Sequence, residues 1–367
     1  MPVYQNERFF LANGKKFKNM WQAYEEVYPT SYDIEPIIEN SVFENLKGLT
    51  VDLERDYESY TIKKVFEEYS DYKINLMYSG GSDSHTIAVK ARENNIQFDK
   101  TITFGESTDP QGNKFDKNLI TNEIKKFFKD DLGYTYIPNN LEWLEEIHYK
   151  KQWYLTSPET GFYPAAKLLQ HSIYSTDELY IYGMEKPNLM YYDKQWYLYL
   201  THTGTTQHFH IPNSLYFNGL NNICPELAVQ QARQAKNFYI KKFGTPEDKL
   251  KFIHYGMPGT DPVFIREWNN AIGRVSVEDS EHDTDQTVTH HMISDRGIQR
   301  LAQLRNAGKQ HVIDDFFQSL KLLYDRHKQI DWKWPMLEPL GRIPWVLNID
   351  TLECFPGSVV GEWMNTQ

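Results

Sequence analysis

Cysteine is scarce in this chain of 367 residues, which contains only Cys224 and Cys354. Two cysteines so far apart exclude a disulfide framework and a cysteine-rich zinc site, and they suit a reducing compartment. Long apolar runs are missing as well, so no segment is a candidate membrane span. Because the start of the chain is polar and charged, we expect no secretory leader and a cytoplasmic location.

An excess of positive charge is also absent. The chain carries 39 Lys and Arg residues against 50 Asp and Glu residues, a formal net charge of −11. This balance disfavours a broad nucleic-acid surface, although a local basic groove stays open as an alternative. Hydrophobic residues make up 40% of the chain and aromatic residues 15%, which predicts a folded globular protein.

Strand-like and helix-like segments alternate from about residue 72. Strand-like segments are expected at 74–78, 100–104, 134–137 and 178–182. Helical segments are expected at 83–94, 118–129, 141–149 and 165–174. This alternation predicts an α/β fold with a doubly wound parallel sheet. A ligand in such a fold binds outside the carboxyl ends of the strands, where the strand order reverses.

The flanking regions have a different character. Residues 1–70 are expected to form an α+β N-terminal appendage, in which Asn13-Gly14 marks a hairpin turn. Residues 71–200 form the α/β domain, and 201–367 are expected to be a mostly helical region for substrate binding and packing. Its helices are expected at 224–243, 298–307 and 312–327, and its end, rich in tryptophan and proline, as an irregular packed tail.

The most informative segment runs from Tyr78 to Ser84, with the sequence YSGGSDS, between a strand-like and a helix-like stretch. Adjacent glycines let the backbone turn tightly and approach an anion, and the amides at the helix start then point at it. Asp83 would repel a bare phosphate, so its presence favours phosphates accompanied by Mg²⁺. The alternative is an ordinary glycine turn followed by a Ser/Asp helix cap.

The segment is neither of the common phosphate loops. A Walker loop ends in Lys-Ser or Lys-Thr, but no lysine occurs between Lys73 and Lys90, and the dinucleotide fingerprint needs three spaced glycines. Instead, Ser79–Ser84 closely resembles the SGGxDS loop of the N-type ATP pyrophosphatases, or PP-loop superfamily. That superfamily includes asparagine, GMP and argininosuccinate synthetases. Its members adenylate a substrate oxygen and release pyrophosphate.

The resemblance carries expectations for fold and site. It implies a HUP-type sheet (adenine nucleotide alpha hydrolase-like) with strand order 3-2-1-4-5, in which strands 74–78 and 179–182 are neighbours. ATP binding is assigned to Ser79, Gly80, Gly81, Ser82, Asp83, Ser84, Phe104 and Gly105. Catalysis is assigned to Asp83, Lys186 and Glu185, with Asp83 and Glu185 as Mg²⁺ ligands. The alternative for Phe104-Gly105 is an ordinary exit from a strand. The alternative for Gly183–Pro187 is a charged turn that only contacts solvent.

The expected reaction is an ATP-dependent, AMP-forming ligation that activates an oxygen of a small molecule and transfers an amine. The cofactors are ATP and Mg²⁺, and the partners are a small-molecule acceptor and an amine donor. No cysteine precedes Cys224, so the N-terminal glutaminase of asparagine synthetases is not expected. The chain resembles asparagine-synthase-like proteins of bacteriophage type without that half, which would act in the host cytoplasm. A nucleotide- or RNA-modifying enzyme and a non-catalytic nucleotide-binding or host-interaction protein are the alternatives.

Two further groups stay open between function and packing. The histidines His202, His208 and His210 cluster in sequence, but a metal site needs ligands that converge from a further position. Polar residues on one face of the helix 226–243 line a substrate cleft in one interpretation and simply face away from the core in the other. These residues are Gln230, Gln231, Arg233 and Lys236.

Overall fold

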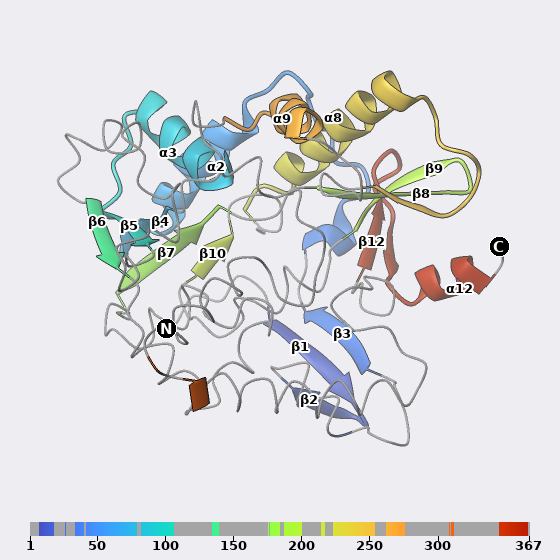
Figure 1. Cartoon of the computed structure of the whole chain (residues 1–367), viewed down its shortest axis with the longest axis horizontal. Coiled ribbons are helices and arrows are strands. Elements are labelled where there is room, and N and C mark those ends of the chain that lie inside the picture. Colours follow the sequence, from blue (N-terminus) through green and yellow to red (C-terminus); the bar gives the residue numbers. More distant parts are fainter. Residues whose placement is uncertain are drawn as a thin grey trace.

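The computed structural model describes residues 7–17, 26, 34–39, 42–78, 82–105, 134–138, 175, 177–183, 187–199, 214–216, 223–253, 262–275, 308, 310–311 and 345–365. These residues form a five-stranded parallel sheet, a five-stranded antiparallel sheet and a three-stranded antiparallel sheet, with helices packed on the two larger ones (Figure 1). The protein is therefore a mixed α/β protein, as the alternating pattern predicts.

The parallel sheet is built from the segments that the sequence marks as strands. Its members are β4 (Lys73–Met77), β5 (Lys100–Gly105), β6 (Tyr134–Pro138), β7 (Glu178–Tyr182) and β10 (Ser214–Tyr216). They lie side by side in the order β10-β7-β4-β5-β6, and every pair is parallel. Numbered along the chain, this is the expected order 3-2-1-4-5. The expected neighbours β4 and β7 are paired, with Met77 opposite Tyr182.

Two helices cover one face of this sheet, α2 (Tyr57–Glu68) and α3 (Ser82–Glu93) (Figure 1). The side chain of Asp56 caps α2 by accepting a hydrogen bond from the Ser59 amide. Apolar residues of α2, α3, β4 and β7 share one core, which includes Ile62, Val65, Leu76 and Ile87. The helices expected at 118–129, 141–149 and 165–174 lie outside the described residues.

The antiparallel sheet draws strands from distant parts of the chain. It has the order β11-β8-β9-β12-β13, with β8 (Asn188–Tyr192), β9 (Gln195–Tyr199), β11 (Lys251–Ile253), β12 (Trp345–Asn348) and β13 (Cys354–Pro356). The β8–β9 hairpin turns on Asp193 and Lys194, at φ 46° and 59°. Two positive φ angles in a two-residue turn match the twist of paired strands.

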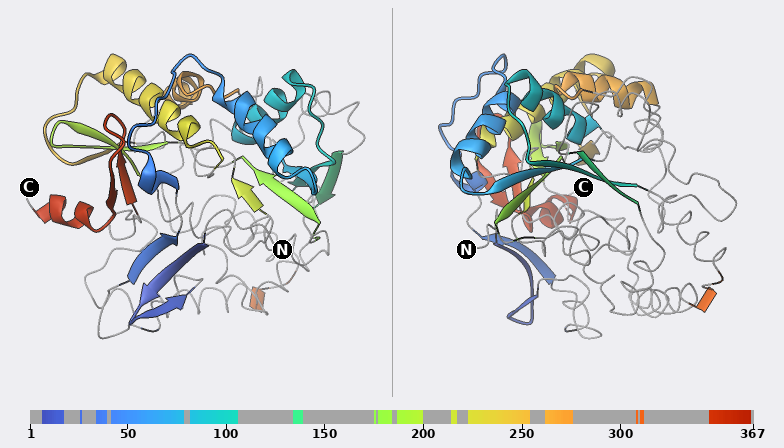
Figure 2. Two further views of the ribbon diagram at one scale, coloured as in Figure 1. Left: turned by 180° about the vertical axis from the view of Figure 1, so that it is seen from behind. Right: turned by 90° about the vertical axis from the view of Figure 1, so that its left-hand side faces the viewer.

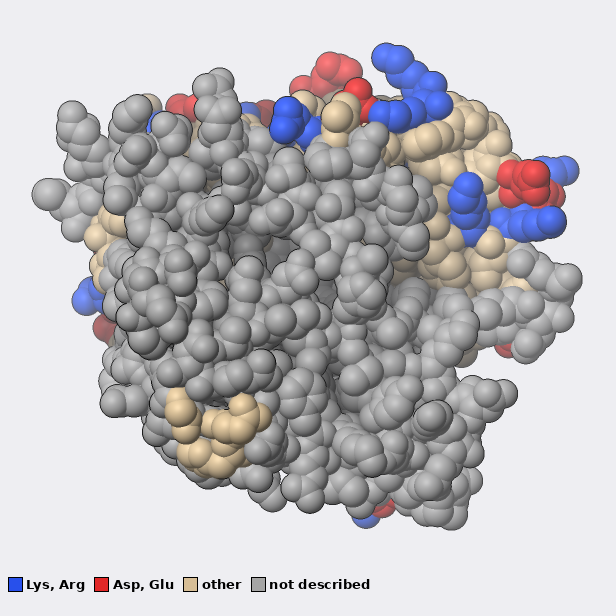
Figure 3. All heavy atoms as spheres, in the orientation of Figure 1, with Lys and Arg blue, Asp and Glu red and all other residues tan. Residues whose placement is uncertain are grey.

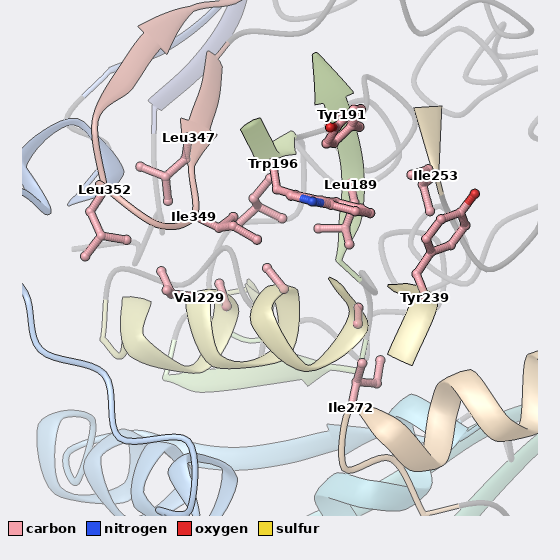
Figure 4. Close-up of a cluster of buried hydrophobic side chains, with 14 of the residues drawn as sticks. Leu189, Tyr191, Trp196, Val229, Tyr239, Ile253, Ile272, Leu347, Ile349 and Leu352 are labelled. Carbon is pink, nitrogen blue, oxygen red and sulfur yellow. The ribbon is translucent and has the colours of Figure 1, made fainter. Parts of the chain in front are cut away.

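Two helices pack on the antiparallel sheet, α8 (Pro225–Phe243) and α9 (Pro262–Ala271). Figure 4 shows their core, in which Val229 and Tyr239 of α8 face Leu189, Trp196 and side chains of the β12 region. The amino-terminal turn of α8 belongs to the other core, because Leu227 packs with the residues of the parallel sheet. α8 therefore bridges the two sheets.

The remaining elements lie at the edges. The expected hairpin at Asn13-Gly14 is present between β1 (Glu7–Ala12) and β2 (Lys15–Phe17), and β1 also pairs with β3 (Ile34–Glu39). A 3₁₀ helix η1 (Val42–Asn45) and a terminal helix α12 (Val359–Asn365) complete the described elements. Figure 2 shows the three-stranded sheet below the other two in both further views.

Two expectations for the flanking regions need correction. The tail is not irregular over 345–365, because Trp345–Asn348 and Cys354–Pro356 complete the antiparallel sheet. The C-terminal region supplies β10, β11, β12 and β13 in addition to its helices. A division at residue 200 cuts both sheets, since β10 joins the parallel one while β8 and β9 join the antiparallel one. Such pairings link short segments far apart in sequence, which no local pattern encodes.

Among the helices described, none combines the length and the apolar character that crossing a membrane requires.

Candidate functional site

The segment with the SGGxDS-like pattern begins where β4 ends. The Tyr78 amide donates to the carbonyl of Ile102 (2.8 Å), and the Thr103 hydroxyl donates to the carbonyl of Tyr78 (2.9 Å). Beyond the segment, the Tyr78 phenol lies 2.8 Å from Nδ1 of His85 on α3. The two groups form a hydrogen bond, and burial raises the pKa of Tyr78 above its ordinary value, so the phenol stays protonated. Both ends of the segment are thus tied to buried groups.

The end of β7 meets the start of α3 at very close range. A Cβ atom added to Gly183 would lie 2.5 Å from the Ser84 amide nitrogen and 2.6 Å from the Asp83 carbonyl carbon. Both atoms belong to backbone, so no side-chain rotation would relieve the clash. Only glycine permits this approach. Gly183 therefore lies directly against the backbone of Asp83 and Ser84, at the start of α3.

This contact lies at the reversal of the strand order. From β4 the chain adds β5 and β6 on one side, and then returns to place β7 on the other side of β4. The start of α3 and the end of β7 therefore flank the carboxyl end of β4, where α/β sheets bind their ligands. Phe104 and Gly105 end the other neighbour, β5, at the same edge.

A buried ion-pair network joins the start of α3 to three other elements. Arg274 has no exposed side-chain area, and its Nε lies 3.0 Å from Oδ1 of Asp83. Its Nη1 lies 2.9 Å from Oε1 of Glu58 on α2. Its Nη2 donates to Oε1 of Gln231 on α8 (3.2 Å), and Gln231 donates in turn to Glu58 (3.1 Å). The Arg274 guanidinium thus forms ion pairs with two carboxylates, those of Asp83 and Glu58.

The two carboxylates differ in environment. Glu58 is buried, and burial raises its pKa to about 7 against the opposing charge of Arg274. The side chain of Asp83 keeps 21% of its area exposed, although Oδ1 itself is buried against Arg274. The contact between Asp83 and Arg274 is an ion pair without hydrogen-bond alignment. The exposure of Asp83 therefore comes from its other atoms.

Local chain geometry explains why Arg274 points inward. Helix α9 ends in a Schellman motif: the Gly273 amide donates to Asn270 (3.2 Å), and the Arg274 amide donates to Asn269 (2.8 Å). Gly273 has φ +82°, a conformation that glycine adopts without strain. The chain therefore reverses at Gly273 and returns toward α3.

The next residue reinforces this contact. The Val275 amide donates to Oγ1 of Thr86 (2.8 Å), and the Thr86 hydroxyl donates to the carbonyl of Ser82 (2.7 Å). The segment after α9 therefore contacts the start of α3 in two ways. Arg274 forms an ion pair with Asp83, and the Val275 amide forms a hydrogen bond with Thr86. Sequence reasoning missed Arg274 and Glu58, and the available signal was Gly273 directly before an isolated arginine at a helix end.

The remaining predicted site residues divide into two groups. Ser82 and Ser84 are buried in the first turn of α3, and Oγ of Ser82 has no hydrogen-bond partner in the described part of the chain. Ser79, Gly80, Gly81, Glu185 and Lys186 lie outside the described residues, as do His202, His208 and His210.

The polar residues of α8 have structural partners. Gln230 donates to the carbonyls of Asp52, Leu53 and Arg55. Arg233 donates to the carbonyl of Ile349 (2.8 Å), and Lys236 pairs with Asp350 (2.8 Å). These contacts favour the packing interpretation of this helix face over a substrate cleft.

The two cysteines are in no position to act as thiolates at neutral pH. Burial raises the pKa of Cys224 to about 11 and that of Cys354 to about 12. Within the described ranges, no group of three or more His, Cys, Asp or Glu side chains converges as a metal site.

Surface charge is mixed on the face shown in Figure 3, where described Lys and Arg side chains lie among Asp and Glu side chains. Lys242 pairs with Glu267, for example, and Lys249 lies 3.8 Å from Glu247.

Comparisons with family models, with curated proteins and with solved structures find no match to the chain.

Proposed function

We propose that the chain is an ATP-dependent, AMP-forming ligase of the PP-loop type with a HUP-type, doubly wound sheet. One observation carries the proposal. The SGGxDS-like segment ends in the first turn of α3, at the reversal of strand order, and Gly183, just after the neighbouring strand β7, lies against the Asp83–Ser84 backbone. A purely structural glycine turn has no need for this approach at the ligand-binding edge of the sheet.

The groups at the start of α3 suit a pyrophosphate. The first amides of a helix have no partner within the helix, and they and the positive end of the helix dipole favour an anion. The Ser82 hydroxyl is buried without a protein partner among the described residues, so it is available to donate to a phosphate oxygen. We assign the pyrophosphate of ATP to Ser79–Ser84 and the adenine to the end of β5, at Phe104-Gly105.

Magnesium fits the same site in its chemistry. Mg²⁺ prefers carboxylate and phosphate oxygens, and Asp83 presents a partly exposed carboxylate beside the proposed phosphate position. Asp83 and Glu185 would hold the ion, which would neutralise charge on the phosphates. The described residues contain no larger acidic group that competes for this role.

The proposed chemistry has two steps. An oxygen of the acceptor attacks the α phosphorus, and the bond from that phosphorus to the bridging oxygen breaks and releases pyrophosphate. An amine then attacks the activated carbon, and AMP leaves with the bonding electron pair. Lys186, three residues after Gly183, would stabilise the negative charge that grows on the α phosphate. Because both described thiols have raised pKa values, sulfur transfer is disfavoured, and ammonia or a donated amine is the proposed nucleophile.

Two other functions of the same fold remain as alternatives. A nucleotide- or RNA-modifying enzyme would use the same adenylation on a base, and a non-catalytic protein would bind nucleotide without turnover. RNA dependence of activity distinguishes the first alternative from the proposal, and absence of pyrophosphate release distinguishes the second. A phage protein acting in the host cytoplasm fits the proposal, with a small-molecule acceptor as its partner.

The deciding experiment is incubation of the purified chain with labelled ATP, Mg²⁺ and pools of small metabolites, followed by chromatography of the nucleotides. We expect AMP and pyrophosphate, and a dominant ADP peak would refute the proposal. Asp83→Asn and Gly81→Val should abolish turnover. Asp193→Asn is the matched control, because Asp193 lies in the exposed β8–β9 turn and asparagine tolerates its positive φ.

A second variant tests the transition-state role. Lys186→Ala should lower kcat by about 10² to 10³ while ATP binding changes much less, as for loss of one oxyanion-stabilising contact. Lys186→Arg should rescue poorly, because a planar guanidinium replaces a compact charge. Turnover of Lys186→Ala near the wild-type rate would mean that Lys186 is only a solvated turn residue.

A further inference from the structure

We propose that Arg274 is a positioning residue for Asp83, and that it makes the segment after α9 part of the nucleotide site. This inference rests on the proposed function and adds a residue from outside the parallel sheet. In it, Arg274 holds Oδ1 of Asp83 and leaves the remaining carboxylate oxygen for the Mg²⁺ that accompanies the nucleotide.

The first argument is geometric. A carboxylate at the start of a helix can rotate, and a site that binds a metal gains affinity when its ligand is held in one orientation. Nε of Arg274 lies 3.0 Å from Oδ1 of Asp83, the oxygen that is buried. The rest of the side chain keeps its exposure, so the ion pair fixes Asp83 without covering it.

The second argument concerns how Arg274 is itself held. Its three nitrogens are directed at three elements: Nε at Asp83 of α3, Nη1 at Glu58 of α2 and Nη2 at Gln231 of α8. The planar guanidinium suits this arrangement because its donors diverge in a fixed fork, which a lysine cannot reproduce. The Schellman turn at Gly273 and the bond from the Val275 amide to Thr86 fix the backbone on either side.

The third argument is the cost of the arrangement. A charged side chain with no exposed area is expensive to bury, and apolar residues of similar volume often serve stability as well. Glu58 compensates this charge only in part, because its own burial favours the protonated form. The contact to Asp83 places the charge of Arg274 at the edge of the sheet where the ligand is proposed. We therefore assign it to the site.

The test measures binding of α,β-methylene-ATP, which cannot be cleaved between the α and β phosphates, by titration calorimetry over a range of Mg²⁺ concentrations. Arg274→Met alone leaves the buried Glu58 unpaired, so the double variant Glu58→Gln/Arg274→Met is used, because it leaves the net charge of the cluster unchanged. Arg233→Met is the matched control, since it removes an arginine that bonds only a loop carbonyl, that of Ile349.

The wild type and Arg233→Met should bind the analogue with the same Mg²⁺ dependence. In the double variant, the gain in affinity from Mg²⁺ should fall by about 10- to 100-fold, the usual effect of losing the partner that orients a metal ligand. Mg²⁺-free binding should change little, which a general loss of structure would not produce. Arg274→Lys should recover part of the gain, because it keeps the charge and loses the fork.

The outcomes separate this inference from the function it rests on. If the wild type gains affinity from Mg²⁺, Asp83→Asn loses that gain and the double variant keeps it in full, Arg274 only stabilises the fold and the inference is overturned. If the wild type binds no analogue with or without Mg²⁺, the proposed function fails and the role of Arg274 fails with it.

Discussion

The two five-stranded sheets of this protein differ in what they bury. In and around the parallel sheet, buried polar or charged side chains are numerous, among them Glu58, Asn75, Ser84, His85 and Glu178. The antiparallel sheet and its helices contribute fewer, namely Asn348 from the strands and Gln230, Gln231 and Asn269 from α8 and α9, beside an extensive cluster of aliphatic and aromatic side chains. Burying polar groups costs free energy unless each one finds a partner.

Chain connectivity accounts for this difference. A parallel sheet places all its strand ends, and the loops that follow them, along one edge, so groups from distant segments meet there. An antiparallel sheet built from hairpins distributes its turns over two edges and serves mainly to cover apolar surface. The structure thus divides into a half that gathers buried polar groups and holds the proposed site, and a half that mainly packs. Arg274, which follows α9 of the antiparallel half, contacts Glu58 and Asp83 on the helices of the parallel sheet.

The largest expected effect breaks that connection. Arg274→Met should lower the free energy of unfolding by about 3–5 kcal/mol, because Glu58 stays buried without its cation. Adding Glu58→Gln should restore a large part of the loss. Equilibrium urea unfolding of the two single variants and the double variant gives the coupling free energy. Additive effects of the two substitutions would contradict a direct interaction.

A somewhat smaller effect is expected from a purely apolar change in the antiparallel half. Leu347 of β12 is fully buried, and Leu347→Ala should cost about 2–4 kcal/mol through lost burial and the cavity that remains. Binding of the ATP analogue at a temperature where the variant is folded should be unchanged. A loss of binding without unfolding would mean that the antiparallel half takes a more direct part in the site than the comparison allows.

A change at the junction of β7 and α3 should affect stability and binding together. Gly183→Ala forces the Asp83–Ser84 backbone to move, and such overpacking typically costs about 1–3 kcal/mol. Because that backbone is the proposed phosphate site, analogue binding should weaken as well. Gly48→Ala is the control. A Cβ atom added to Gly48 would meet no atom within 4 Å, so this substitution should cost only the strain of placing alanine at a positive φ. Equal binding by both variants would count against the proposed site.

The sequence predicted the chemistry-bearing half better than the packing half. Strands β4 to β7 and helix α3 have the alternation and the flanking turn residues that local patterns convey, so their existence and approximate bounds followed from the sequence. The resemblance of Ser79–Ser84 to a known loop added the strand order. Strands β11, β12 and β13 are three or four residues long. β11 and β12 pair with β8 and β9, which lie 60 or more residues away, and only the pairing of β13 with β12 is local. Nothing in such short segments encodes the pairing.

The missed site residues illustrate the same limit. Glu58 and Arg274 are 216 positions apart in sequence, and each resembles an ordinary surface residue at the end or in the first turn of a helix. Their meeting depends on the packing of α2, α8 and α9, which is a tertiary property. Asp83 was recognisable because its spacing from the two glycines is local. The partner that holds it was not.

A pH dependence of stability should distinguish two acids of one helix. Burial raises the folded-state pKa of Glu58 from 4.5 to about 7, so folding favours its protonated form. The stabilising contribution of Glu58 should therefore be fully present below pH 4.5, decline as pH rises from 4.5 to 7, and be lost above that. The decline should not exceed about 1.4 kcal/mol per pH unit, the limit for a single proton.

Asp56, the cap of the same helix, should act in the opposite direction. Burial opposes its ionisation, but the Ser59 amide and Lys90 outweigh burial and lower its pKa below 3.8. Its contribution is present above pH 3.8 and is lost as pH falls through the lowered pKa, so the two windows do not overlap. Urea unfolding from pH 3 to 8 should show a decline between pH 4.5 and 7 that Glu58→Gln removes and Asp56→Asn leaves in place. An unchanged decline in Glu58→Gln would show that Glu58 is ionised throughout, and that Arg274 compensates its burial fully.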